Sequence, residues 1–115
     1  MTEEQPPARR RFPRIASNHS VLLKRLGDEM EEFVRTRTIA VGGCSVVSAE
    51  RVGLGSNLEL LIAVDGGVVT ARGRVIYENE MRDGRFDVGV EFGDLNANDA
   101  ERISQMFEKP REVGE

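Results

Sequence analysis

Four arginines fall within six residues near the start of the chain, in the segment RRRFPR: Arg9, Arg10, Arg11 and Arg14. A guanidinium group donates paired hydrogen bonds to phosphate oxygens or to the O6 and N7 atoms of guanine, and its flat face stacks on bases. Four such groups together favour an anionic ligand, and a guanine nucleotide would use each of these properties. The same composition also fits a solubilising basic tail.

Positive charge is concentrated in this segment. The 115-residue chain has 16 Lys and Arg residues and 20 Asp and Glu residues, a formal net charge of −4, so the remainder carries −8 once these four arginines are set aside. Proteins that lie along DNA or RNA, or on an anionic membrane, usually present a broad basic face, because their affinity comes from many phosphate contacts. We therefore expect a small anionic ligand and no DNA or RNA partner.

Residues suited to catalysis or metal binding are scarce. His19 is the single histidine and Cys44 the single cysteine, which excludes an intramolecular disulfide and the Cys/His zinc sites. His19 falls at the start of an expected strand, where a histidine is usually a surface residue, and Cys44 begins an apolar strand, where a small buried hydrophobe is usual. The acidic residues of segment 28–32 are typical of a solvated hairpin tip. We expect no catalytic residue, no metal and no cofactor.

The chain has the features of one cytoplasmic domain. No apolar run reaches the roughly 18 residues that span a bilayer, and the polar first ten residues do not resemble a signal peptide. This length suits one compact domain, which we place at residues 9–108. We expect flexible tails at residues 1–8 and 109–115.

The elements that must position the arginines are predominantly strands. Short apolar segments separated by Gly- and Asp-containing turns favour a sandwich or barrel, and we expect a small antiparallel barrel. The expected strands are residues 21–23, 32–41, 44–48, 58–64, 68–77 and 86–92. Segment 58–64 alternates poorly and is expected to be buried on both faces or nearly so. In segment 68–77, simple alternation predicts one face made of Val69, Ala71, Gly73, Val75 and Tyr77.

The last element has a helical pattern. Asn96 is placed as an N-cap and Asp99 lies in the first turn, where a negative charge is favourable. The apolar residues that follow at helical spacing are Ala100, Ile103, Met106 and Phe107. They predict one amphipathic helix of about three turns that covers one opening of the barrel.

Taken together, these features resemble the PilZ domain family, bacterial receptors of cyclic di-GMP, over about residues 9–108. The RxxxR motif of the family lead-in is matched by Arg10 to Arg14, and Arg9 supplies the longer RRxxxR form. The second motif, (Asp/Asn)-x-Ser-x-x-Gly, is matched by residues 38–43. Gly43 retains the glycine, whereas Thr38 replaces the acidic or amide residue and Ala40 replaces the serine.

The resemblance implies a six-stranded antiparallel β-barrel with a C-terminal α-helix, whose flexible lead-in folds across the barrel when the ligand arrives. The arginines would bind phosphate and guanine of one or two ligand copies, and the second motif would hydrogen-bond the guanine edge. Tyr77 matches a position that often carries an aromatic or bulky residue lying against a base, although strand packing explains it equally well. The implied ligand-binding residues are Arg9, Arg10, Arg11, Arg14, Thr38, Ala40, Gly43 and Tyr77.

Two functions follow. The first is a single-domain cyclic di-GMP receptor or adaptor, which signals to a separate partner, a downstream protein of the motility or surface-attachment (biofilm) machinery. The alternative is a degenerate PilZ barrel that binds no nucleotide and acts as a protein-interaction module, because Thr38 keeps one hydroxyl and Ala40 keeps no polar group. An unpaired guanine donor costs about 1–3 kcal/mol, roughly tenfold to a hundredfold in affinity. We favour the receptor, because a chain that binds no anion would not benefit from four unpaired arginines.

A third function, a barrel that binds single-stranded nucleic acid, is disfavoured. Such proteins use aromatic platforms beside a basic groove. The chain has five Phe, one Tyr and no Trp.

Overall fold

The computed structural model describes residues 15–113, with side chains described for residues 15–106. This part consists of β1 (Ile15–Ala16), β2 (Ser20–Arg25), β3 (Glu31–Ala40), β4 (Gly43–Ser48), β5 (Asn57–Val64), β6 (Gly67–Glu80), β7 (Phe86–Phe92) and α2 (Ala97–Val113). The expected strands are all present, with β6 longer than predicted. β1 was not predicted. The expected tail at residues 1–8 lies outside the described residues.

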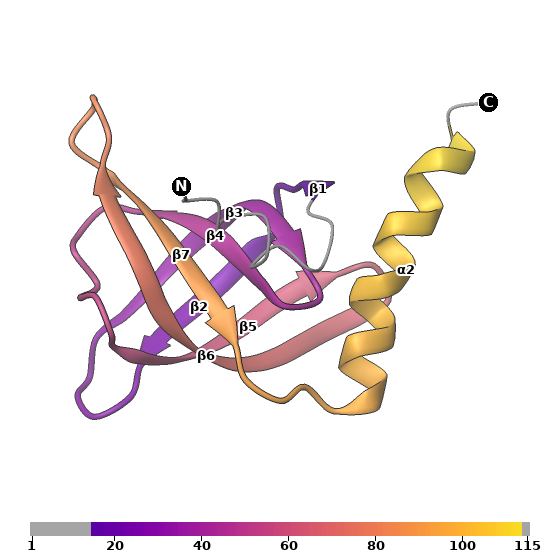
Figure 1. Cartoon of the computed structure of the whole chain (residues 1–115), viewed down its shortest axis with the longest axis horizontal. Helices are drawn as coiled ribbons and strands as arrows, with labels where there is room; N and C mark the ends of the chain where they lie inside the picture. The colour runs from indigo at the N-terminus through magenta and orange to yellow at the C-terminus, as the bar shows by residue number, and fades with distance from the viewer. Residues whose placement is uncertain (1–14, 114–115) are drawn as a thin grey trace, which may run out of the picture.

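Strands β2 to β7 form a closed antiparallel barrel in the order β3-β2-β5-β6-β7-β4, completed by pairing of β4 with β3 (Figure 1). β1 adds a short pairing to the free side of β3, where Ile15 lies opposite Ile39 and Ala16 opposite Thr38. The six-stranded antiparallel barrel with a C-terminal helix is therefore confirmed.

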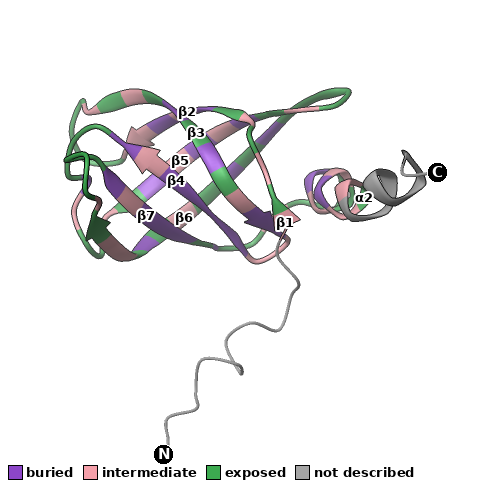
Figure 2. Ribbon diagram, turned by 90° about the horizontal axis from the view of Figure 1, so that it is seen from above, coloured by how far each residue is buried: buried purple, intermediate pink, exposed green. Residues whose placement is uncertain are grey.

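The core fills the barrel interior and is built from alternate residues of each strand (Figure 2). Cys44 is 1% exposed within it, as expected for a small hydrophobe. In β5, Leu58, Leu60 and Ile62 are fully buried, whereas Ala63 is exposed. On the other face Glu59 and Leu61 are half-buried, so the burial expected on both faces is complete only on the face toward the core.

A β-bulge in β3 changes which side chains face the core. The pairing with β4 shifts between Thr36 and Thr38, so Arg37 is the extra residue. Thr36 is buried with the inward set, and beyond the bulge Ile39 faces the core. Because a one-residue shift exchanges the two faces, Thr38 and Ala40 lie on the outer side of the barrel.

A second bulge in β6 has the same effect. The pairing with β7 shifts between Val75 and Tyr77, and Val75 pairs with Val90 inside the barrel. Tyr77 pairs with Gly89 on the outer side. The prediction that Tyr77 shares a face with Val69 and Val75 is therefore wrong, because simple alternation does not continue through a bulge.

Helix α2 lies at one end of the barrel, near β1 (Figure 1). The Asn96 side chain caps it as predicted, since Asn96 Oδ1 accepts a 2.8 Å hydrogen bond from the Asp99 backbone N–H. Ile103 is fully buried against the barrel. The helix continues to Val113, past the boundary expected at residue 108 and through most of the segment expected to be a tail. No helix of residues 15–113 is both long and apolar enough to cross a membrane.

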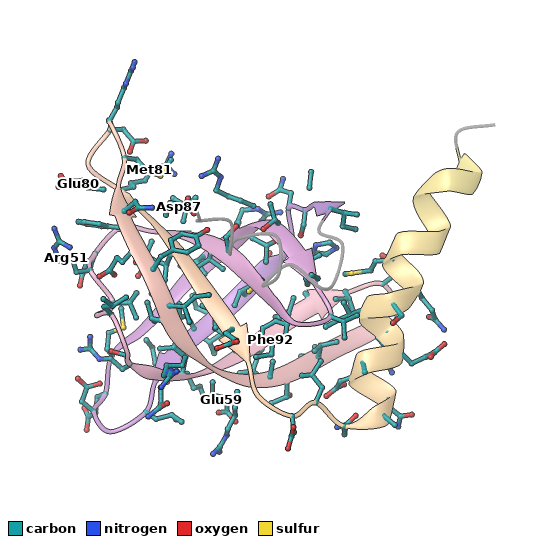
Figure 3. The ribbon with its side chains drawn as sticks, in the orientation of Figure 1. Arg51, Glu59, Glu80, Met81, Asp87 and Phe92 are labelled. Carbon is teal, nitrogen blue, oxygen red and sulfur yellow. The ribbon has the colours of Figure 1, made fainter. Side chains whose placement is uncertain are left out.

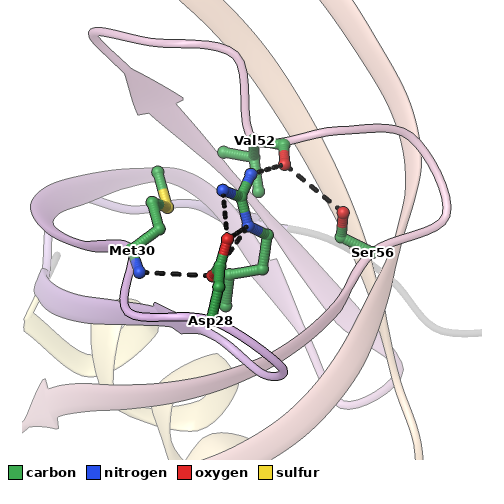
Figure 4. A network of polar contacts seen from close by, with 5 residues as sticks. Asp28, Met30, Val52 and Ser56 are labelled. Carbon is green, nitrogen blue, oxygen red and sulfur yellow. Dashed lines mark hydrogen bonds and ion pairs between the residues drawn. The ribbon is translucent and has the colours of Figure 1, made fainter.

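At the end of the barrel away from α2, Arg25 joins the β2–β3 hairpin to the β4–β5 loop (Figure 4). Its Nη1 donates a 2.6 Å hydrogen bond to the Val52 carbonyl, and its Nη2 meets Asp28 Oδ2 at 2.8 Å. Asp28 Oδ1 accepts from the Met30 N–H at 3.2 Å. The Arg25 hydrogen bond, followed by that of the Met30 N–H, lowers the pKa of the exposed Asp28 carboxyl. This acidic segment is the hairpin tip that the sequence suggested.

Candidate functional site

Of the eight predicted ligand-binding residues, the structure describes four: Thr38, Ala40, Gly43 and Tyr77. The four arginines of the lead-in lie outside the described residues. The described four lie on the outer side of the barrel wall formed by β3, β4, β7 and β6. The site is therefore built on a sheet face that is continuous through backbone pairing.

One row of paired residues crosses all four strands. Thr38 pairs with Ser45, Ser45 with Gly89, and Gly89 with Tyr77. The Thr38 and Ser45 hydroxyls hydrogen-bond to each other at 2.8 Å. At about 4.8 Å between neighbouring strands, the Cα atoms of Thr38 and Tyr77 are roughly 14 Å apart.

The next row contains the two other residues of the second motif, Ala40 opposite Gly43. A Cβ atom at Gly43 would lie 2.3 Å from the Val90 carbonyl oxygen, so β7 leaves no room for any side chain there. Ala40 is only 3% exposed. The motif glycine thus has a packing reason that is independent of any ligand.

The Tyr77 ring lies flat over Gly89. A Cβ atom built on Gly89 would fall 2.1 Å from Tyr77 Cε2, so the ring occupies the space that a side chain would take. The residue is half-buried. The bulge places this aromatic surface on the outer side, in line with the Thr38–Ser45 pair.

An ion pair that the sequence analysis missed lies beside this row. Arg37, the extra residue of the β3 bulge, places Nη1 3.2 Å from Asp87 Oδ2 on β7. Figure 3 shows Asp87 on the half of β7 nearer the β6–β7 hairpin tip, with Phe92 toward the other end. Asp87 Oδ1 is enclosed and has no hydrogen-bond partner among the described residues.

The end of the lead-in is attached to the same wall. β1 pairs with β3 at Ala16 and Thr38, and the Ser17 backbone N–H donates to the Arg37 carbonyl at 2.9 Å. The buried Thr36 hydroxyl accepts from the His19 backbone N–H at 2.8 Å and also hydrogen-bonds to the Ser17 hydroxyl. These bonds anchor the chain that follows the arginine segment beside the second motif.

The sequence analysis missed both Ser45 and Asp87, but only Ser45 could have been predicted from the sequence. A two-residue turn at Val41 and Gly42 sets Ala40 opposite Gly43 and therefore Thr38 opposite Ser45, so Ser45 could have been found from the hairpin register. The position of Asp87 depends on how β7 pairs with β4, strands that are far apart in the sequence. No local pattern carries that information.

The assembled face offers a ligand the half-buried Thr38 hydroxyl, an aromatic ring, one arginine and one carboxylate, with the Ser45 hydroxyl buried behind Thr38 as its hydrogen-bond partner. Such groups can hold a nucleotide through stacking and hydrogen bonds. Among the side chains that the structure describes, no three His, Cys, Asp or Glu residues are grouped as metal ligands.

Comparison with known proteins agrees with this arrangement. The family model described as PilZ domain matches residues 8–109. A search of curated protein sequences finds no match.

Several solved structures share the fold. The Bacillus subtilis inhibitor of motility MotI has a TM-score of 0.75 at 18% identity, with 92% of this chain and 52% of that chain covered. MrkH of K. pneumonia in complex with c-di-GMP has a TM-score of 0.72 at 17% identity, with coverages of 91% and 53%. The PilZ domain of Escherichia coli YcgR with c-di-GMP has a TM-score of 0.69 at 15% identity, with coverages of 91% and 94%. The chain thus spans about half the length of the first two proteins.

Proposed function

Because the chain belongs to the PilZ domain family, we propose that it is a cyclic di-GMP receptor whose arginine segment folds onto the outer face of β3, β4, β7 and β6 around the ligand. The observation that carries the proposal is β1, which pairs Ala16 with Thr38. Arg14 is two residues before Ala16 in the chain, and consecutive Cα atoms are about 3.8 Å apart. The described chain therefore begins beside the second motif, directly after the arginine segment in the sequence.

The chemistry of the ligand matches what the two parts offer. Cyclic di-GMP carries two phosphates, for which the guanidinium groups of Arg10 and Arg14 are suited, and two guanines, which can accept from arginine at O6 and N7. The barrel face adds the Tyr77 ring as a stacking surface. MrkH and the YcgR domain, which share the fold, were solved with c-di-GMP.

The loss of the motif serine is partly offset by the neighbouring strand. Ser45 lies opposite Thr38, and although Ser45 is buried, its hydroxyl holds the half-buried Thr38 hydroxyl next to the position where Ala40 provides no polar group. A hydroxyl can both donate and accept. We expect binding with the affinity reduced by the missing charge at Thr38 and not abolished.

We infer further that the bound form signals to a separate protein in the cytoplasm. Ordering the arginine segment would give the barrel a new surface, and the similarity to an inhibitor of motility supports a partner in motility or surface attachment. The receptor role requires no catalytic residue and no cofactor besides the ligand.

The test is calorimetric titration of the full chain with cyclic di-GMP. We expect saturable binding for the wild type and a loss of at least tenfold in affinity for Arg10→Ala and Arg14→Ala. Arg72→Ala is the matched control, since Arg72 is exposed on β6 five residues before Tyr77, where it pairs with Glu59 of β5. No binding by the wild type at ~100 μM ligand, which corresponds to about −5.5 kcal/mol, would refute the receptor.

One observation favours the alternative, a PilZ barrel that binds a protein without nucleotide. Ala40 is almost fully buried and Gly43 is required by packing, so neither residue offers a group to a ligand. This alternative predicts that Arg10→Ala and Arg14→Ala leave partner binding unchanged. It also predicts that Thr38→Asp fails to create nucleotide binding.

A further inference from the structure

We propose that Tyr77, Asp87 and Arg37 form a base-reading site on the outer face of β7, in which a guanine lies on the Tyr77 ring and donates its N1–H and N2–H groups to the Asp87 carboxylate. The inference rests on the proposed function and assigns a specificity role to a carboxylate outside both sequence motifs. It assigns to Asp87 on β7 the role of the acidic residue that Thr38 replaces in the second motif.

The first step of the argument is the position of the ring. Tyr77 lies over Gly89, and Asp87 is two residues before Gly89 on the same strand and the same face. Residues two apart along a strand are separated by about 6.8 Å. This is about the length of a purine, so a base stacked on the ring can reach the carboxylate with its edge.

The second step is the unused hydrogen-bonding capacity of Asp87. Its Oδ1 is the one buried side-chain oxygen or nitrogen without a partner within the part of the chain that the structure describes. Asp83, two residues before Arg85, differs in this respect: its Oδ1 accepts from the Arg85 N–H at 3.0 Å and its Oδ2 from Arg85 Nε at 2.8 Å. An enclosed acceptor without a donor is unfavourable, and a donor supplied by a ligand would satisfy it.

The third step is the access of a ligand to the Asp87 carboxylate. Arg37 meets only Oδ2, at 3.2 Å, and its side chain is 50% exposed whereas that of Asp87 is 21% exposed. Most of the solvent-exposed surface of this ion pair therefore belongs to Arg37. Movement of Arg37 would free Oδ2 for a ligand, and the freed guanidinium could donate to guanine O6 and N7 or to a phosphate.

Guanine has the matching pattern and adenine does not. The Watson–Crick edge of guanine presents two donors, N1–H and N2–H, which a carboxylate accepts with its two oxygens. Adenine presents an acceptor at N1 and a donor at N6, so one carboxylate oxygen would face a lone pair. The Asp87 site should therefore discriminate guanine from adenine.

The experiment is calorimetric titration of the full chain with cyclic di-GMP and with cyclic di-AMP. Asp87→Asn keeps the shape and replaces one acceptor with a donor. We expect its affinity for cyclic di-GMP to fall roughly tenfold to a hundredfold, while its affinity for cyclic di-AMP is unchanged or higher. Asp83→Asn is the matched control and should preserve both affinities. A structural role for Asp87 would lower the melting temperature without changing base preference.

The outcomes separate this inference from the function on which it rests. If the wild type binds neither dinucleotide, the receptor proposal is wrong and this site falls with it. If the wild type binds cyclic di-GMP and Asp87→Asn shows the same affinity and preference, only the base-reading site is wrong.

A second pair of variants keeps the test decisive if Asp87→Asn does not fold. Tyr77→Ala should weaken binding of cyclic di-GMP roughly tenfold to a hundredfold, since it removes the stacking surface. Tyr77→Phe retains the ring and should bind like the wild type. Equal affinities for these two variants would contradict the site.

Discussion

At the scale of single residues, the described part of the site combines groups that packing requires with groups that packing leaves free. Gly43 is required by the approach of β7, and Gly89 by the Tyr77 ring. Asp87, in contrast, keeps an oxygen that no described residue uses. Among the described residues, those that match the second motif are therefore not the ones with the most unused hydrogen-bonding capacity.

Gly43→Ala tests the packing role of the motif glycine. The new Cβ would lie 2.3 Å from the Val90 carbonyl oxygen, an atom of the β7 backbone that cannot move alone. Overpacking of this kind typically lowers the free energy of unfolding by about 1–3 kcal/mol. Urea denaturation of Gly43→Ala and of the wild type measures this loss of unfolding free energy.

The control for this substitution is Gly93→Ala. A Cβ there would be 3.7 Å from the nearest atom, the Arg72 carbonyl oxygen, which is an ordinary contact. This variant should be as stable as the wild type or slightly more stable, because alanine restricts the unfolded chain. Equal losses in the two variants would show that the close approach at Gly43 has no energetic weight.

At the scale of elements, two bulges shape the outer face, and β1 and α2 are attached to the barrel. The bulges in β3 and β6 turn Thr38 and Tyr77 outward. β1 attaches the end of the lead-in, and α2 is attached through its apolar side, with Ile103 fully buried. The barrel itself is closed by pairing, so these additions can vary without opening it.

The N-cap of α2 provides a test at this scale. Asn96→Ala removes the oxygen that accepts from the Asp99 N–H, and loss of such a cap costs about 0.5–2 kcal/mol of unfolding free energy. Asn98→Ala, at an exposed helix position, should change stability by less than about 0.5 kcal/mol. Urea denaturation of both variants measures the difference, and identical stabilities would contradict the cap.

At the scale of the whole molecule, the two ends of the barrel have different roles. The end near α2 carries β1, whereas at the opposite end Arg25 joins the β2–β3 hairpin to the β4–β5 loop. The second end contains the carboxyl of Asp28, whose lowered pKa links folding to pH. The stability of the barrel should therefore depend on acidity through a site remote from the ligand.

The direction of this dependence follows from the pKa. The Asp28 pKa is lower in the folded protein than the ordinary value of about 3.9, so its stabilising contribution is present above that pH and is lost as the pH falls through the folded value. Asp28→Asn should be less stable than the wild type by a constant amount at pH 5–8, and the gap should narrow below about pH 4. Thermal melts across this range measure the gap.

The control is Asp94→Asn, an exposed position after β7. The difference in stability between Asp94→Asn and the wild type should be near zero at pH 5–8. A gap between Asp28→Asn and the wild type that persists unchanged in acid would contradict the ion-pair origin of the effect.

The sequence by itself determined the barrel, the capped helix and the arginine cluster. These depend on local patterns: alternating apolar residues, glycine turns, an Asn–Asp cap and composition. The register of the β3–β4 hairpin was also present in the sequence, since the two-residue turn at Val41 and Gly42 places Ser45 opposite Thr38.

Only the tertiary structure decided which residues share the outer face. Alternation alone predicted the wrong face for Tyr77, because a bulge at Ile76 shifts the pairing with β7 by one residue. Likewise, Arg37 meets Asp87 only because the barrel closes β3 through β4 onto β7. Pairing between strands distant in the chain follows from closure of the whole sheet, and no short segment of sequence encodes it.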